Sequence, residues 1–441
     1  MAKIILVSKP LKVDQFIAHL RTPLYRNGYA LMISTVLTSA LGLLYWTIAA
    51  RVYQTEDVGL NSMAISTMIF LAGVAQINLQ EAMIRFIPRA GTRTRQMALY
   101  SYGIVIVLSL IVSVIFCLGI AIWSPALSFL ITSPMAILWF ALAMVLWGIF
   151  VLEDSILMGL RQALYIPVEN AVFSVLKIAV LIAAVSLLPR TGIFVSWTLS
   201  VVLVIIPINW LIFRRLIPQH IEAAHGTDAP VSLREMAKYV AANYIAALLS
   251  SLASAALPII ITQIAGATAN AYFYLAWIIA SALQVVAANM STSLTVEATM
   301  ASEQQEEIRR HALIGSARIL IPLVLLIVVF APLILRIIGQ DYVEQGTLLL
   351  QLLALSALPN LFNMVYVGMA RARNQIGSII GVYGANALIV LGLSFVFLPQ
   401  FGITGIGVAW VISQTLIMGA LLALPRLTTR RSEQIVKEVS L

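Results

Sequence analysis

Residues 191–200 read TGIFVSWTLS, and residues 404–413 read TGIGVAWVIS. Six of the ten positions are identical, and the matched residues include a threonine, a glycine and a tryptophan. The Leu-Pro pair at 188–189 matches the pair at 398–399, at a shift of 210 that becomes 213 after a three-residue insertion. A chance match between apolar stretches is the simpler alternative, but the shared Trp, Gly and Pro favour an internal duplication.

The sequence around this repeat has the composition of a membrane protein. Of its 441 residues, 61% are hydrophobic and only 10% are charged. A soluble domain carries about 25% charged residues because its surface faces water. The apolar excess must therefore face lipid, and the chain is predicted to be an all-α membrane protein. Runs long enough to cross a bilayer as helices occupy twelve ranges: 28–50, 58–82, 98–123, 135–158, 168–188, 192–213, 236–262, 270–296, 313–335, 345–370, 376–398 and 402–425.

The distribution of basic residues predicts the topology, because Lys and Arg collect in cytoplasmic loops. With the N-terminus inside, 23 of the 27 Lys and Arg residues fall in cytoplasmic segments. Arg51, Arg190 and Arg336 fall in outer loops, and Lys177 lies inside a span. One missing or extra span would break this alternation. Both termini are therefore predicted to be cytoplasmic, and the net charge of +9 indicates topology rather than a nucleic-acid partner.

Each copy of the repeat holds six spans, an even number, so both copies have the same orientation. This predicts two pseudo-symmetric six-helix bundles related by an axis along the membrane normal, a layout common among alternating-access transporters. The predicted units are an interfacial or cytoplasmic segment 1–26, a bundle 27–213, a cytoplasmic linker 214–235, a bundle 236–425 and a cytoplasmic tail 426–441. Val13, Phe16, Ile17 and Leu20 recur at helical spacing, which suits either an interfacial helix or an ordinary juxtamembrane segment.

The sequence offers little for metal or cofactor chemistry. Its one cysteine, Cys117, lies inside an apolar run, which excludes an intrachain disulfide and a thiolate metal site. The four histidines fall in polar connections, and no cluster of histidines and carboxylates appears at ligand spacing. We therefore predict no metal, no cofactor and no catalytic residue.

Lys177, Glu153 and Asp154 lie well inside the predicted spans, where a charge costs about 2.5–3.5 kcal/mol at the helix centre. Lys177 lies near the midplane of the fifth span, and Glu153 and Asp154 lie in the inner half of the fourth. Asp154 and Lys177 differ in depth by roughly 7 Å at about 1.5 Å per residue, so a Lys side chain almost covers the gap. A midplane cation favours a functional role, and the alternative is that these charges only join helices.

A second polar group lies at the inner end of the second span, where Asn78, Glu81 and Arg85 share one helical face. Glu81 and Arg85 stand at i, i+4, so an interfacial ion pair is the structural alternative. At the repeat shift, Phe150, Glu153 and Gln76 of the first half have uncharged polar counterparts in the second half. These counterparts are Asn289, Asn360 and Asn363.

We interpret these residues as the lining of a polar, partly cationic cavity that opens to the cytoplasm and admits a hydrophilic, anionic head group. The complete predicted set is Lys177, Arg85, Glu81, Asn78, Glu153, Asp154, Asn289, Asn360 and Asn363.

Several stretches resemble a known family of transporters. Residues 42–46 (GLLYW), 49–53 (AARVY), 58–60 (VGL) and 82–88 (AMIRFIP) are similar to the start of bacterial polysaccharide-biosynthesis flippases. These form the oligosaccharide-lipid branch of the superfamily that also contains the multidrug and toxic-compound extruders. Residues 154–163 (DSILMGLRQA), with Asn170 and Lys177 after them, are also similar to that family.

The resemblance implies a V-shaped pair of six-helix bundles in the bacterial cytoplasmic (inner) membrane. It implies that lipid-linked oligosaccharides, built on undecaprenyl pyrophosphate, move from the inner to the outer leaflet for the synthesis of surface polysaccharides such as lipopolysaccharide. The sugar would cross the cavity while the lipid tail stays in the bilayer, and Lys177 and Arg85 would offset the pyrophosphate charge. The implied partners are this substrate, membrane lipids and other membrane proteins of polysaccharide assembly.

Two other functions compete with this one. A cation-coupled multidrug extruder of the same fold commonly depends on an acidic residue in the first span, and residues 28–50 contain no Asp or Glu. Its acid chemistry would have to come from Glu153 and Asp154. A membrane glycosyltransferase, polymerase or ligase needs acids or bases on sizeable outer loops. Near the start of the chain only Glu56 and Asp57 stand there, and Asp57 is more simply a helix N-cap. We therefore expect a transporter rather than an enzyme.

Overall fold

The computed structural model describes residues 23–224, 233–300, 305–373 and 375–439. The predicted interfacial helix before the first span lies outside these residues. The described chain is helical throughout its regular structure. Eleven of its helices are long and apolar enough to cross a membrane, and residues Leu37–Val52 form a further, shorter apolar helical stretch. The predicted multi-pass all-α membrane protein is confirmed.

Fourteen α-helices make up most of the described residues. Those of the N-terminal half are α2 (Pro23–Val52), α3 (Thr55–Gln76), α4 (Leu79–Phe86), α5 (Thr94–Trp123), α6 (Pro134–Gly159), α7 (Tyr165–Ala184), α8 (Gly192–Leu211) and α9 (Ile217–Ala224). Those of the C-terminal half are α10 (Leu233–Ala265), α11 (Ala267–Met300), α12 (Gln305–Arg336), α13 (Gln340–Ala372), α14 (Ile376–Phe401) and α15 (Ile403–Val439).

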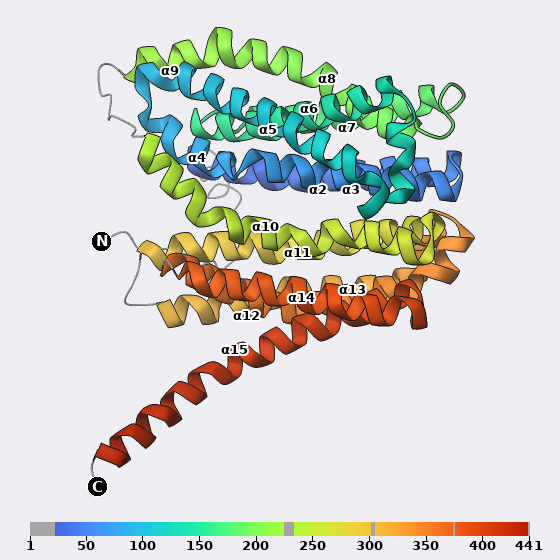
Figure 1. The fold of residues 1–441 in the computed structure, drawn as a ribbon. Helices are drawn as coiled ribbons and strands as arrows, with labels where there is room; N and C mark the ends of the chain where they lie inside the picture. Colours follow the sequence, from blue (N-terminus) through green and yellow to red (C-terminus); the bar gives the residue numbers. More distant parts are fainter. Residues whose placement is uncertain (1–22, 225–232, 301–304, 374, 440–441) are drawn as a thin grey trace, which may run out of the picture.

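The helices form two bundles, as the repeat predicts (Figure 1). In the first, α2 packs on α7, α5 on α6, and α7 on α8. In the second, α11 and α12 pack on α13, and α14 packs on α15. The two copies of the repeated sequence fall at the start of α8 and of α15, which places Trp197 and Trp410 in buried positions of their respective bundles.

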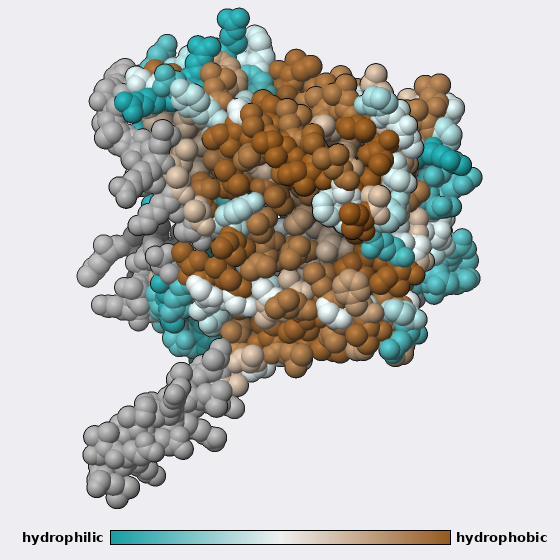
Figure 2. Space-filling view, viewed as in Figure 1, coloured by the Kyte–Doolittle hydropathy of each residue, from teal (hydrophilic) through white to brown (hydrophobic). Residues whose placement is uncertain are grey.

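The outer surface of the bundles is apolar, as lipid contact requires. Leu118 and Ile122 on α5 are 82% and 85% exposed, and Leu388 on α14 is 77% exposed. On the face shown in Figure 2, hydrophobic residues form a broad band, with hydrophilic residues gathered toward the two ends of the molecule. A water-facing helix would carry charges at such positions, so this band marks the region that faces the hydrocarbon core.

The two bundles meet closely at the end where α3 and α11 begin, here called the Gly59 end. A Cβ added at Gly59 would lie 1.8 Å from the carbonyl oxygen of Ala267, so only glycine permits this approach. The Asn270 side-chain amide donates to the carbonyl oxygen of Gly59 at 2.8 Å and contacts the Ser62 hydroxyl at 3.2 Å. These contacts join the bundles at this end.

The opposite end of the bundles, here called the basic end, holds α4, α9 and the exposed arginines Arg85 and Arg89. The second span is shorter there than predicted, because α3 ends at Gln76 rather than near residue 82. Ile77 and Asn78 have φ values of 42° and 61°, which no α-helix can accommodate, and α4 begins after them. The first part of the predicted linker, residues 217–224, is helical as α9.

Candidate functional site

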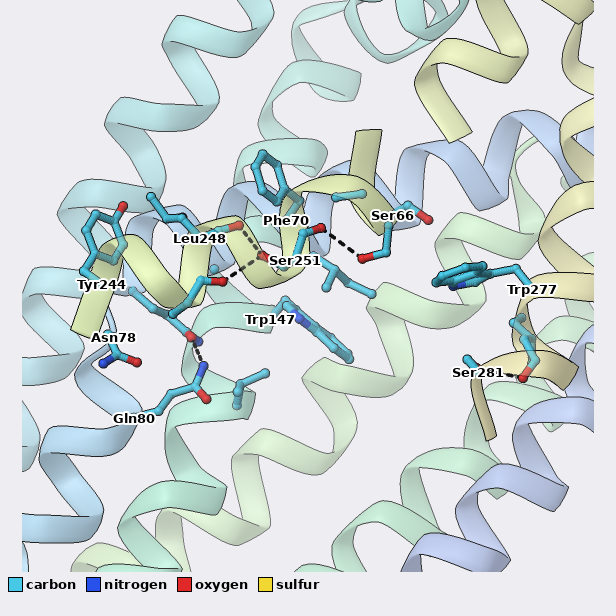
Figure 3. A pocket seen from close by; sticks show the side chains of 18 of the residues that line it. Ser66, Phe70, Asn78, Gln80, Trp147, Tyr244, Leu248, Ser251, Trp277 and Ser281 are labelled. Carbon is cyan, nitrogen blue, oxygen red and sulfur yellow. Dashed lines mark hydrogen bonds between the residues drawn. The ribbon is translucent and has the colours of Figure 1, made fainter. Parts of the chain in front are cut away.

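A pocket of about 510 Å³ lies between the two bundles, where α3, α6, α10 and α11 meet. Trp147 from α6 and Trp277 from α11 both extend into this region (Figure 3). The aromatic lining residues are Phe70, Trp147, Tyr244, Tyr274 and Trp277. The lining residues with hydroxyl or amide groups, apart from the tyrosines, are Ser66, Gln76, Asn78, Gln80, Ser251, Ser254 and Ser281. None of the described lining residues is charged.

A second pocket of about 320 Å³ continues from the first into the C-terminal bundle. The two share Ser254, Trp277 and Ser281. Its lining is rich in amides, and these are Gln284, Asn360, Asn363, Asn386 and Gln414. No lining residue of this pocket in the described chain is charged either.

The amides of the second pocket hold one another in place. The Asn363 side-chain amide donates to both the side-chain oxygen and the carbonyl oxygen of Gln414, at 2.8 and 3.0 Å. The Gln414 amide donates in turn to Asn386 Oδ1 at 2.9 Å. Three buried atoms of residues that line this pocket have no hydrogen-bond partner in the protein, namely Asn363 Oδ1, Gln284 Nε2 and Trp410 Nε1. The amide network therefore fixes the positions of Asn363, Asn386 and Gln414 in the pocket wall.

Lys177 does not line either pocket. Its ammonium group lies 4.4 Å from the ring centroid of Trp197 and 5.0 Å from those of Tyr45 and Phe173, and the residue is 5% exposed. Three rings around one cation give a cation–π site, which stabilises a buried ammonium group. Trp147 contacts both Phe173 and Trp197, so Lys177 lies one layer behind the pocket wall.

The pairing of Lys177 with Asp154, left open by the sequence, is not formed. Within the described part of the chain, the single ion pair closer than 4 Å joins Arg309 and Glu306. Asp154 instead lies beside Asn170 of α7. Three aromatic rings, rather than the carboxylate, surround the Lys177 ammonium group.

Glu153 belongs to a buried acidic cluster that includes Glu169, a residue that the sequence analysis missed. Glu153 and Glu169 are 0% and 1% exposed, and their carboxyl groups lie side by side. Glu153 accepts a hydrogen bond from the Asn209 amide of α8, whose Oδ1 accepts one from the Tyr102 hydroxyl at 3.0 Å. Neither oxygen of Glu169 has a hydrogen-bond partner in the protein. Glu169 is the only acid in the predicted span 168–188, a signal that could have identified it.

The group at Asn78, Glu81 and Arg85 is divided by the break after α3. Asn78 lines the first pocket, whereas Glu81 and Arg85 are exposed on α4. The prediction that all three share a face of the second span is wrong, because positive φ values at Ile77 and Asn78 end that helix.

The counterparts in the second half also divide. Asn360 and Asn363 line the second pocket, whereas Asn289 is exposed on α11 and lines neither. The cavity as a whole is therefore polar but uncharged over its described lining, and the predicted partly cationic lining is corrected in this respect. The tryptophans and serines that line the two pockets are absent from the predicted set of cavity residues. An aromatic residue within a span is more often part of the core.

Comparison with known proteins agrees with this architecture. The described fold is similar to an inward-facing multidrug resistance MATE family transporter of the MOP superfamily, with a TM-score of 0.68 and 18% identity over 90% of this chain and 96% of that one. An outward-facing structure of the same family gives a TM-score of 0.65 and 19% identity over 95% and 99%. A MOP superfamily transporter from Pyrococcus furiosus gives 0.62 and 17% over 95% and 98%. These likenesses concern the fold alone.

No curated protein shows significant sequence similarity to the chain. The family model described as "polysaccharide biosynthesis protein" matches residues 24–296, which is more than half of the sequence. That match covers the whole N-terminal bundle and the first two helices of the second, including both walls of the first pocket. The fold of the chain is similar to that of MOP superfamily transporters. The chain belongs to the polysaccharide biosynthesis protein family.

Proposed function

We propose that the protein is a flippase that moves a lipid-linked oligosaccharide, of the undecaprenyl-pyrophosphate type, from the inner to the outer leaflet of the bacterial cytoplasmic membrane. The observation that carries this proposal is the pocket between the bundles, whose hydroxyl, amide and aromatic side chains suit a sugar. The family match points to polysaccharide biosynthesis, and the fold points to transport between two bundles. A transporter rather than an enzyme accounts for both.

The basic end is the cytoplasmic end in this proposal, because Lys and Arg collect on that side. The pocket reaches toward it through Asn78 and Gln80, while the Gly59 end is closed. This arrangement is that of an inward-facing carrier, which takes up its substrate from the cytoplasmic leaflet. The bundles would then separate at the Gly59 end and release the sugar outside.

The arginines at the basic end supply the charge for the pyrophosphate. Arg85 stands on α4, five residues beyond Gln80 at the pocket, or roughly 7 Å of helix. Arg371 at the end of α13 is also exposed at this end and donates to the Tyr383 hydroxyl at 3.4 Å. The uncharged pocket would take the sugars while the pyrophosphate stays at the arginine-rich rim, with the lipid tail in the bilayer.

A cation-coupled multidrug extruder is the second candidate, and the buried acidic cluster favours it. Glu153, Asp154 and Glu169 lie together in the N-terminal bundle, where buried carboxyl groups are a common feature of proton relays. Multidrug transporters stand among the solved structures with a similar fold. Against it stands the pocket, which holds no acidic side chain among its described residues to attract a cationic drug.

Reconstitution in liposomes separates the two candidates. The purified protein is inserted into vesicles that contain fluorescent undecaprenyl pyrophosphate bearing a trisaccharide, and an impermeant quencher reports which leaflet holds the probe. A flippase equilibrates the probe between leaflets, whereas protein-free vesicles do not. In the same vesicles, uptake of a cationic dye driven by a pH gradient, without movement of the lipid probe, would contradict the flippase and support the extruder. The Trp210→Leu variant, changed at an exposed position on α8 that lines neither pocket, should move the probe as the parent protein does.

A further inference from the structure

The two joined pockets are polar without being charged, and this bears on which sugars they accept. Every described residue that lines them is apolar, aromatic, a serine or an amide. Arg371 donates to the hydroxyl of Tyr383, which lines the second pocket, but Arg371 is itself exposed at the basic end and lines neither pocket. Lys177 is separated from the first pocket by the rings of Phe173 and Trp197.

The second pocket presents polar atoms that lack a partner in the protein. Asn363 is 1% exposed, yet its Oδ1 accepts no hydrogen bond, and Gln284 Nε2 and Trp410 Nε1 donate none. Buried polar atoms are nearly always satisfied, so these three mark a wall with unused hydrogen-bonding capacity rather than a closed apolar core. A sugar hydroxyl both donates and accepts, so it can bond to the serine hydroxyls and to either end of the amides that line the pockets.

Trp277 provides a wall that both pockets share. Trp410 meets it edge to face at 4.7 Å, and Phe273 stacks against it at 5.9 Å between ring centroids, which fixes its orientation. A pyranose ring has an apolar face of C–H groups that packs against an indole, with its hydroxyls directed sideways toward polar groups. The serines and amides around Trp277 stand where such hydroxyls would need partners.

We propose that the joined pockets select lipid-linked oligosaccharides whose sugars are uncharged, an inference that rests on the proposed flippase function and adds the substrate class. A sugar hydroxymethyl group fits a lining of hydroxyls, amides and rings. A uronate carboxylate, or a phosphate or sulfate on the sugar, would enter the same lining without a cation to pair with. An unpaired buried charge carries a large desolvation penalty, so the site discriminates by rejection of the charged analogue.

The test compares two probes that differ at one carbon atom. Both are fluorescent undecaprenyl pyrophosphates, one bearing a trisaccharide of glucose and the other the same trisaccharide with its terminal glucose replaced by glucuronic acid. Flipping is measured in the liposome assay described above. The glucose probe is expected to move at least about 100-fold faster than the glucuronate probe.

Equal rates for the two probes would overturn the inference and leave the flippase function standing. Movement of neither probe would contradict the flippase function itself, and the inference with it. A variant gives a second measurement, because Gln284→Lys places a cation at a pocket position with an unpartnered amide nitrogen. The ratio of glucuronate to glucose rates is expected to rise at least about tenfold in this variant. An unchanged ratio in folded Gln284→Lys protein would also count against the inference.

Discussion

The contact at Gly59 sets the balance between the two orientations of the carrier. In Gly59→Ala the new Cβ would lie 1.8 Å from the Ala267 carbonyl oxygen, while ordinary van der Waals contact begins at 3.4 Å. The helices α3 and α11 must therefore move apart by about 1.6 Å. Such a shift would break the bond of 2.8 Å between Asn270 and the Gly59 carbonyl oxygen.

The magnitude follows from these two losses. Overpacking costs about 1–3 kcal/mol, and one lost hydrogen bond costs about 1 kcal/mol, so the closed state loses about 2–4 kcal/mol. A difference of this size shifts a two-state equilibrium by roughly 30- to 1000-fold toward the state that is open at the Gly59 end. The carrier would then spend most of its time outward-facing, and net transport would fall.

Cysteine labelling measures this shift. Cys117 is replaced by serine, Ser254 in the pocket is replaced by cysteine, and whole cells are treated with an impermeant maleimide from outside. Labelling should be slow in the parent and at least about tenfold faster with Gly59→Ala. Gly103→Ala is the control, because a Cβ there meets nothing within 4 Å. Unchanged labelling in a correctly folded Gly59→Ala protein would refute the assignment of this contact as the outer closure.

Three further predictions concern the pocket and its surroundings. Trp277→Leu should reduce flipping at least about tenfold in the liposome assay, because the side chain that forms a wall of both pockets is lost. Trp210→Leu, at a position 65% exposed, should leave flipping unchanged. Equal effects of the two substitutions would count against a role of Trp277 in binding the sugar. Lys177→Ala should abolish export while protein levels stay normal, because the cation that orders the rings behind Trp147 is lost; normal export in cells would remove Lys177 from the mechanism. Arg85→Ala should raise the substrate concentration for half-maximal flipping several-fold, as the loss of an exposed ion pair of about 1 kcal/mol implies; an unchanged value would exclude a contact with the pyrophosphate.

Much of the fold follows from the sequence because the bilayer imposes simple rules. The spans, the duplication and the alternation of basic residues all depend on hydropathy and charge, which are readable residue by residue. The repeat at Trp197 and Trp410 also pointed to equivalent positions in the two bundles, and each tryptophan packs against one that lines the pocket, Trp147 and Trp277 respectively.

The site was less predictable, for a physical reason. Depth along a helix follows from counting residues, but the direction in which a side chain points depends on packing between helices. Lys177 lies within α7, inside a predicted span, yet it faces three rings rather than the cavity. The break at Asn78 depends on two residues with positive φ, of which Ile77 gives no local signal and Asn78 only a weak one, since asparagine tolerates this region. Glu169 is the second residue of the predicted span 168–188, and its pairing with Glu153 depends on the packing of α6 against α7 and α8.

The most direct test of the central claim is to deplete the protein in its native host and determine which leaflet then holds the lipid-linked oligosaccharide. The flippase account predicts that complete units accumulate facing the cytoplasm. Complete but unpolymerised units on the outer face would contradict it and indicate an enzyme of polymer assembly. Normal export together with altered sensitivity to cationic compounds would contradict it in favour of a multidrug extruder.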